Sequence, residues 1–443
     1  MKHKVIIGLE VHVELKTQSK MFCGCSAQYF GENPNTHTCP VCLGLAGALP
    51  YPNKKAIGWC VKIGLALNCE ILSHSKFDRK NYFYPDLPKG YQISQYDLPF
   101  CINGKIKIEQ NGKEEEIRIR RVHMEEDTGK LIHETVNGEK VSLIDFNRSG
   151  VPLVEIVTEP DFENALEVKQ YLQKLQQIIR YLAVSDADME KGQMRLEPNI
   201  SISFNLASKE LPKYKVEVKN INSFSFVEKA VNYEIKRQLE VLEKGETPIQ
   251  ETRGWDEKSQ KTVSQRIKEE ANDYRYFPEP DIPPIEWTKQ EIELIKKSLP
   301  ELPDEKIGRF DKEYSLSKYD AGIITREIAV ADYFEECIKV GQKDKVTAKQ
   351  IANYIINKKI NVDDVLPAKL VEEILKLNKT EEINIDELKL VVQKVLKNNP
   401  KILNDYKNGK ESVIQFAIGQ VMYVIKKKID VNIVKNLILE ELK

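Results

Sequence analysis

The chain has 443 residues, of which 41% are hydrophobic and 30% are charged, so it exceeds the length that one core usually serves, and two or three domains are expected. Its formal net charge of −1 gives no global positive field, so any binding of nucleic acid depends on a local patch. No apolar run approaches the roughly 20 residues of a membrane helix, and the first residues lead into a strand pattern rather than a signal peptide; we therefore expect a cytoplasmic protein with no membrane partner.

The first predicted strand covers residues 5–15, where apolar side chains alternate with a second set. This period of two is typical of a half-buried strand. The second set includes Glu10, His12 and Glu14, which therefore share one face of the strand. Ionisable groups are costly to bury unpaired. We expect this face to line a cleft and to offer ligands for a hard metal ion.

Two cysteine pairs follow this strand. Thirteen residues separate Cys23 and Cys25 from Cys39 and Cys42, and thiolates at such spacing hold Zn²⁺ tetrahedrally in structural sites. Disulfides are the alternative, and they are uncommon in a cytoplasmic chain. The other four cysteines have no partner at useful spacing and are expected to be buried small apolar residues. The sequence therefore predicts one structural zinc ion.

Two aromatic segments come next, at residues 77–96 and 273–284. Both combine tyrosines and phenylalanines with cations, acids and prolines, and proline disfavours regular structure around it, so each segment is predicted to be a loop. Fixed cations and flat rings suit a planar, polyanionic ligand such as a nucleotide. For the first segment alone, a structural loop with its rings in the core is an equally good interpretation. The second segment favours the ligand.

A run of acids closes a strand predicted at residues 117–123, and Glu125 and Glu126 lie in it. Carboxylates from two strands suit Mg²⁺, which shares oxygen ligands with substrate phosphates; a solvated charge run is the alternative. Lys215, Glu217 and Lys219 share one face of a later strand, either to neutralise phosphate charge or as a surface ladder of ion pairs. The sequence contains no P-loop and no dinucleotide-binding glycine motif. A bound nucleotide would therefore need a metal-bearing cradle on a sheet.

The elements up to residue 287 are mixed, with helices predicted at residues 43–67 and 165–182, further strands at residues 200–204 and 215–219, and no regular βαβ alternation. This pattern indicates an α+β fold with a largely antiparallel sheet. A proline-rich span at residues 278–303 and Leu366-Pro367 mark two boundaries, beyond which the pattern is helical and the last part mildly basic. We predict domains at residues 1–290, 291–366 and 367–443.

Several ordered motifs resemble those of one family, the B subunits of the aspartyl/glutamyl-tRNA amidotransferases. These motifs span nearly the whole chain, and they are Ile7–Leu15, Cys39–Pro50, Arg79–Gln95, Glu125–Lys130, Asp273–Asp281 and Gly409–Met422. The resemblance implies a cradle domain similar to the glutamine-synthetase and guanido-kinase fold, then an all-α helical domain and an all-α, YqeY-like tail that contacts tRNA. It also implies an ATP- and Mg²⁺-dependent phosphorylation of the side-chain carboxylate of Glu-tRNA(Gln), and in some members Asp-tRNA(Asn). Ammonia from glutamine then displaces the phosphate. The implied partners in a heterotrimer are the amidase subunit, which releases the ammonia, together with a small third subunit.

The resemblance also implies roles for individual residues. Mg²⁺ is assigned to Glu10, His12, Glu125 and Glu126. The expected catalytic residues are Glu10, His12, Glu125, Lys80 and Lys89. The residues assigned to ATP or to the activated carboxylate are Arg79, Lys80, Tyr82, Asp86, Lys89, Gln92, Ser94, Gln95, Glu190, Arg195 and Lys219. Such chemistry needs metal ions and cations around the phosphates rather than a nucleophile triad.

The chain departs from the family pattern at two places. Glu197 stands where the family commonly has aspartate, which keeps the charge with a longer reach. Gly254 stands where a second arginine is expected after Arg253, which removes one contact to phosphate or tRNA. The sequence lacks a large insertion before the tail, which argues against the related archaeal subunit. The alternative function is a non-catalytic tRNA-binding scaffold of the same complex; an unrelated zinc-ribbon protein would leave the aromatic segments and acidic strands unexplained.

Overall fold

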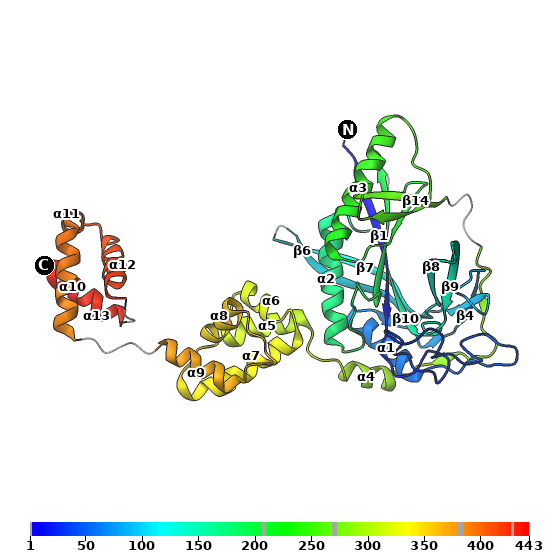
Figure 1. Cartoon of the computed structure of the whole chain (residues 1–443), viewed down its shortest axis with the longest axis horizontal. Coiled ribbons are helices and arrows are strands. Elements are labelled where there is room, and N and C mark those ends of the chain that lie inside the picture. The colour runs from blue at the N-terminus through cyan, green and yellow to red at the C-terminus, as the bar shows by residue number, and fades with distance from the viewer. Residues whose placement is uncertain are drawn as a thin grey trace. The chain divides into compact units, whose positions relative to one another are not determined.

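The computed structural model describes residues 2–110, 112–205, 210–267, 273–378, 384–426 and 429–442 (Figure 1). The chain divides into two compact units, Met1–Lys306 and Ile307–Lys443. Within the described ranges, no helix combines the length and the apolar character needed to cross a membrane.

A large sheet organises the first unit (Figure 1). Its order in the described residues is β14-β13-β12-β11-β1-β10-β7-β6-β2, and every neighbouring pair is antiparallel except β12 with β13. The strands are β1 Lys4–Glu14, β2 Glu70–Ile71, β6 Cys101–Gln110, β7 Lys113–Glu126, β10 Pro152–Thr158, β11 Met194–Ser203, β12 Val216–Lys219, β13 Glu251–Asp256 and β14 Lys261–Ile267. With the helices beside it, this sheet confirms the α+β prediction.

The helices of the first unit are α1 Lys54–Ala66, α2 Ala165–Tyr181, α3 Phe224–Glu243 and α4 Lys289–Lys297. The apolar residues of β1 form one core with apolar residues of α1, α2 and α3. Because side chains alternate along a strand, this arrangement leaves Glu10 and His12 on the sheet face away from that core. The predicted helix at residues 43–67 begins only at Lys54, where the side chain of Asn53 caps it; the residues before it form turns around Cys39 and Cys42.

Smaller sheets bring the two aromatic segments together. β15 Phe277–Pro278, β4 Asp78–Asn81 and β5 Tyr91–Ser94 form one sheet, in which Phe277 pairs with Arg79. The segments are therefore partly strand, whereas the sequence predicted loops. Pro85 and Pro88 lie in the connection between β4 and β5, so they do not interrupt either strand. Two further pairs are β16 Ile285–Glu286 with β3 His74–Ser75, and β8 Lys130–Val136 with β9 Glu139–Asp145.

The second unit is helical wherever it has regular structure in its described residues. Its α-helices are α5 Pro303–Tyr314, α6 Lys318–Ile324, α7 Ile328–Gly341, α8 Ala348–Lys358, α9 Pro367–Asn378, α10 Ile385–Asn398, α11 Pro400–Lys407, α12 Val413–Ile425 and α13 Val431–Leu442; a 3₁₀ turn, η1, covers Gln342–Asp344. One core lies among α5 to α9 and another among α10 to α13. Ile295 of α4 packs on the core of the first unit, and Leu370 of α9 belongs to the core of α5 to α9. The predicted domain boundary after residue 290 falls inside α4, and the one after residue 366 falls at the start of α9.

Candidate active site

The register of the large sheet aligns four ionisable side chains across four neighbouring strands. His12 of β1 pairs with Arg195 of β11 on one side and with Glu155 of β10 on the other, and Glu155 pairs with His123 of β7. Paired residues project from the same face of a sheet. The face away from the core of α1 to α3 therefore carries a row of charges across its centre.

Three of the side chains on this face form a cluster that could hold a metal ion. Ligand atoms of His12, Glu125 and Glu155 all lie within 4.8 Å of one another. Glu125 and Glu155 are buried, and Gln92 Nε2 donates to Glu125 Oε2 at 2.6 Å. The two carboxylates suit a hard divalent cation such as Mg²⁺, which prefers oxygen ligands, and the imidazole adds a nitrogen donor. The predicted ligands His12 and Glu125 are thus brought together, with Glu155 as a third.

His123 lies between the two carboxylates of this cluster. Its Nε2 lies 3.0 Å from Glu125 Oε1 and 3.1 Å from Glu155 Oε2. Burial lowers the pKa of His123, but the two carboxylates outweigh that effect and raise it above its usual value. Burial likewise opposes ionisation of Glu155, and His123 nevertheless holds the pKa of Glu155 well below its usual range. Sequence analysis missed Glu155, although a lone glutamate in the apolar run of β10 is a recognisable signal.

The aromatic segments supply a cation and rings beside the cluster. Burial lowers the pKa of Lys80, but the charges of Glu125, Tyr276 and Glu155 together outweigh burial and raise the pKa above its usual value. The ammonium therefore stays charged. Lys80 Nζ also lies 5.1 Å from the centroid of the Tyr274 ring. Tyr82 packs edge-on against Tyr274, with centroids 6.0 Å apart. The second aromatic segment therefore lies against the first, a contact that the sequence had not predicted.

A second carboxylate cluster lies on β1, β11 and β12. Ligand oxygens of Glu10, Glu197 and Glu217 lie within 4.8 Å of one another, and Lys219 Nζ lies 3.0 Å from Glu197. Burial raises the pKa of Glu197, and the charge of Lys219 offsets part of that rise. Glu197, which stands where the family commonly has aspartate, thus places its carboxylate in this cluster. Glu10 and Lys219 are brought together here, apart from the cluster of His12.

A third group joins Arg195 to residues at the end of β1. Arg195 Nη2 donates to Asp127 at 2.7 Å, and Tyr29 Oη donates to Glu14 at 2.9 Å. Burial, reinforced by the neighbouring charge of Asp127, raises the pKa of Glu14 to about 8. Burial acts against the charge of Asp127 as well, but Arg148 and Arg195 lower its pKa. Glu14 is therefore protonated at neutral pH and lacks the charge of a hard-metal ligand.

Several predicted site residues are engaged in holding the protein together. Arg79 makes a bidentate pair with buried Glu279, at 2.6 and 2.7 Å, which ties the two aromatic segments to each other. Lys89 donates to Glu126, whose carboxylate also accepts the Ile93 N–H at 2.9 Å. Glu126 belongs to neither of the two carboxylate clusters described above.

The remaining predicted residues divide in the same way. Gln92 and Ser94 donate to Glu125 and orient it. The Gln95 carboxamide accepts the Met124 N–H and donates to the Lys76 and Leu98 carbonyls, so it supports the backbone. Asp86 accepts the Thr128 hydroxyl at 3.0 Å, and Glu190 is exposed in a turn where its N–H donates to Asp188.

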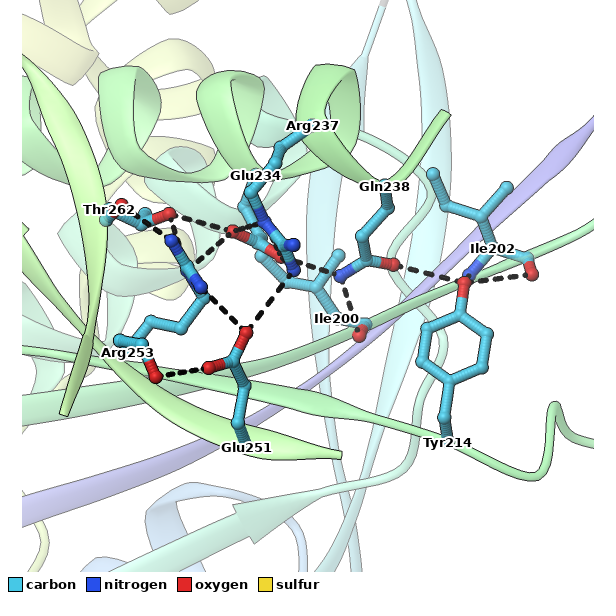
Figure 2. Close-up of polar contacts among 10 residues, drawn as sticks. Ile200, Ile202, Tyr214, Glu234, Arg237, Gln238, Glu251, Arg253 and Thr262 are labelled. Atoms are coloured by element: carbon cyan, nitrogen blue, oxygen red, sulfur yellow. Dashed lines mark hydrogen bonds and ion pairs between the residues drawn. The ribbon is translucent and has the colours of Figure 1, made fainter. Parts of the chain in front are cut away.

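Arg253 faces the opposite side of the sheet from the clusters. Figure 2 shows it in a buried network with Glu234 and Arg237 of α3 and with Glu251 of β13. Its guanidinium lies 2.6 Å from Glu251 and donates to the Thr262 hydroxyl at 2.9 Å. This arginine therefore fastens β13 to α3.

Gly254, the next residue, lies on the cluster face, paired with Lys219. A Cβ there would come within 2.2 Å of Gln265 Nε2. The side chain of Gln265 thus occupies space that an arginine at position 254 would need, and this agrees with the departure noted in the sequence.

The four cysteines of the predicted zinc site converge. Their Sγ atoms all lie within 4.8 Å of one another, and those of Cys39 and Cys42 are 3.8 Å apart. A tetrahedral Zn²⁺ with bonds of about 2.3 Å requires sulfurs about 3.8 Å apart, so the donor set fits this ion. A hydrogen bond with Cys23 is the largest of the effects that lower the pKa of Cys42 to about 4. Buried Lys20 adds positive charge, with its ammonium 3.6 Å from the sulfur of Cys42.

Comparison with known proteins agrees with the geometry. Residues 5–293 match the GatB/GatE catalytic domain, and residues 324–442 match the GatB domain. Three proteins named as B subunits of aspartyl/glutamyl-tRNA(Asn/Gln) amidotransferase, from Caldicellulosiruptor saccharolyticus, Thermodesulfovibrio yellowstonii and Thermoanaerobacter sp. strain X514, are each 47% identical to this chain. The matches cover 100% of this chain and 99%, 100% and 100% of those proteins. The fold and site thus define a subunit of a tRNA-dependent amidotransferase. The chain belongs to the family of aspartyl/glutamyl-tRNA amidotransferase B subunits, as its motifs predicted.

Proposed function

We propose that the cluster face of the large sheet phosphorylates the side-chain carboxylate of a glutamyl or aspartyl group carried on tRNA, with ATP as donor, so that ammonia then displaces the phosphate. The carrying observation is the cluster of His12, Glu125 and Glu155 beside the charged Lys80. A carboxylate has no good leaving group at neutral pH, and an acyl phosphate has one. Phosphoryl transfer of this kind depends on positioning and on charge stabilisation.

The residues divide between holding metal and holding charge. His12, Glu125 and Glu155 are the proposed ligands of one Mg²⁺, and Glu10, Glu197 and Glu217 of a second. When bound there, such ions would supply positive charge to stabilise the transferring phosphoryl group. Gln92 and Ser94 orient Glu125, and the ring Nε2 of His123 lies within 3.1 Å of both Glu125 and Glu155. This set replaces Glu126 of the sequence-based proposal with Glu155.

Two cations complete the proposed site, one beside each cluster. Lys80 is coupled to the first cluster through Glu125 and Glu155, and Lys219 pairs with Glu197 in the second. Both ammonium groups carry their charge among carboxylates, and each can exchange a carboxylate partner for a phosphate oxygen. The Tyr274 ring lies 5.1 Å from the Lys80 ammonium, and Tyr82 packs edge-on against that ring.

The rest of the family assignment is part of the same proposal. Cys23, Cys25, Cys39 and Cys42 would hold a structural zinc ion in the cradle domain, whose fold would be similar to that of glutamine synthetase and guanido kinases. The chain would work in the cytoplasm with the amidase subunit, which is the source of ammonia, and with the small third subunit of the complex. The helical parts after residue 290, and above all residues 367–443, would contact Glu-tRNA(Gln) or Asp-tRNA(Asn).

The test is ADP release from MgATP by the chain assembled with its partner subunits. Release that requires the glutamyl ester, and is not seen with uncharged tRNA(Gln), is expected. His12→Ala and Glu155→Gln should each abolish it with the fold intact, whereas Glu134→Gln, an exposed carboxylate on β8, should not change it. Release indifferent to the ester, or normal rates in both cluster variants, would leave the chain as a tRNA-binding scaffold.

A further inference from the structure

The turn that carries Cys39 and Cys42 reaches beyond the four cysteines to Lys89. Gly44 lies in this turn, where its N–H donates to the Val41 carbonyl at 3.0 Å and its φ is +67°. A Cβ on Gly44 would come within 2.4 Å of Lys89 Cγ and 3.1 Å of Lys89 Cα. Only a glycine fits at that distance. Gly44 is therefore packed directly against Lys89, two residues after a cysteine of the predicted zinc site.

A second glycine, Gly150, borders both the cysteines and Glu126. A Cβ at this position would lie 3.5 Å from Cys42 Cβ, 3.6 Å from Lys20 Cδ and 3.9 Å from Glu126 Oε2. Beside it, the Ser149 hydroxyl donates to the Cys42 carbonyl at 3.1 Å. The zinc site and Glu126 are therefore in contact with one and the same stretch of backbone.

Lys20 fastens the segment before Gly150 to the cysteines. Its side chain is fully buried, and its ammonium donates to the Phe146 carbonyl at 3.4 Å and to the His37 carbonyl at 2.7 Å. The same nitrogen lies 3.6 Å from Cys42 Sγ. Four thiolates carry more negative charge than one Zn²⁺ neutralises, so a buried ammonium beside them favours the zinc-bound form. The zinc site is thus joined to this segment by a buried cation.

Lys89 and Glu126 in turn hold the backbone that carries Glu125, a proposed Mg²⁺ ligand. Lys89 Nζ donates to the Glu126 carboxylate, and the two side chains are only 10% and 3% exposed. The Glu126 carbonyl accepts Gln92 Nε2 at 2.7 Å, and the same nitrogen donates to Glu125 Oε2 at 2.6 Å. Displacement of the Lys89 ammonium would leave a buried carboxylate without its ion-pair partner, next to Glu125 in the chain.

We propose that the zinc site positions Lys89 and Glu126, and through them Glu125, so that zinc binding raises the affinity of the cluster of Glu125 for Mg²⁺. Lys89 is then a positioning residue, and Gly44 is the contact through which the zinc site acts on it. The inference rests on the proposed function, because the Mg²⁺ of this cluster belongs to that proposal.

The first test disturbs the contact with Lys89 and leaves the cysteines intact. Gly44→Ala places a methyl group against Lys89, whereas the control Gly47→Ala places one where nothing lies within 4 Å. Gly47 has a φ of +83°, so both variants put alanine into left-handed backbone. The difference between them therefore reports the contact alone.

Binding of Mn²⁺, which takes the same oxygen ligands as Mg²⁺, is measured in the assembled complex without ATP. Paramagnetic resonance recognises an ion held by a histidine nitrogen, and His12 belongs to the cluster of Glu125. Gly44→Ala should weaken the binding of this ion roughly tenfold relative to Gly47→Ala, with about one zinc per chain in both variants. Equal affinities in the two variants would overturn the proposal.

A double-mutant cycle checks that the effect passes through Lys89. Lys89→Ala removes the Cγ atom with which the methyl group of Gly44→Ala collides. Gly44→Ala should therefore weaken Mn²⁺ binding much less in that background than in the wild-type chain. Additive effects of the two substitutions would contradict a path through Lys89.

The second test follows zinc rather than Mn²⁺. Because coupling between two sites is reciprocal, the contacts that order Lys89 also order the turn of the cysteines. Lys89→Met and Glu126→Gln should each speed the transfer of zinc to a chelator, and the exposed-site control Glu134→Gln should not. Wild-type rates in both pair variants would refute the coupling. Faster zinc loss in a complex that binds no Mn²⁺ through a histidine would support the coupling and overturn the proposed Mg²⁺ site.

Discussion

Removal of the Glu234 carboxylate is expected to destabilise the first unit strongly. Glu234 is fully buried on α3 and accepts hydrogen bonds from Arg237, Gln238 and Thr262 at 2.6 to 3.1 Å, as Figure 2 shows. The guanidinium of Arg253 lies 3.6 Å from it. Glu234→Ala leaves these donors without their acceptor and leaves two guanidiniums sharing one remaining carboxylate.

The magnitude follows from what that remaining carboxylate can take over. Loss of one partner from a buried ion pair costs about 3–5 kcal/mol. Glu251 already lies 2.6 Å from Arg253 and 3.8 Å from Arg237, so it compensates in part. We therefore expect about 3 kcal/mol, the lower end of the range. At about 2.1 cal/mol/K of unfolding entropy per residue, the first unit, Met1–Lys306, shifts its Tm by about 1.6 °C per kcal/mol, which gives a loss of about 5 °C.

Thermal unfolding of the full chain, followed by circular dichroism, measures this loss. The matched control is Glu228→Ala on the same helix, whose partner Lys169 lies 2.7 Å away with both side chains partly exposed. Such a surface pair contributes about 0–1 kcal/mol. Equal Tm values for the two variants would show that the network of Figure 2 does not stabilise the unit.

Three further predictions concern the site and its surroundings. The folded chain keeps the Glu14 proton up to about pH 8, whereas an unfolded glutamate loses it near 4.5, so Glu14 lowers stability as pH rises between these values; Glu14→Gln should flatten the Tm profile over that range, and a parallel profile would contradict this. Arg79→Lys loses the bidentate bond to Glu279, so we expect a lower Tm with the KM for ATP unchanged; the reverse result would restore Arg79 as a nucleotide ligand. Metal analysis should find about one zinc per chain, lost in Cys39→Ser and kept in Cys60→Ser.

Local patterns in the sequence were sufficient for the individual elements. The alternation in residues 5–15 predicted β1 and placed Glu10, His12 and Glu14 on one face, because side chains alternate along any strand. The spacing of Cys23, Cys25, Cys39 and Cys42 predicted that they converge, and they do. Composition indicated a ligand-binding role for each aromatic segment and predicted loops; it did not predict β4 and β5, nor that β15 of the second segment pairs with β4 of the first.

What the sequence could not provide was which strands lie side by side. Glu155 meets His12 and His123 only because β10 lies between β1 and β7, and that order depends on long-range pairing. Glu10 and His12, although they lie on one strand, belong to different clusters. Long-range packing also pairs Arg79 with Glu279 and Lys89 with Glu126. Sequence by itself determined the family, the half-buried strands and the cysteine site, because these depend on residue type and short-range spacing. Tertiary structure alone decided which charges meet, since Coulomb and hydrogen-bond energies depend on distances that only the packed sheet sets.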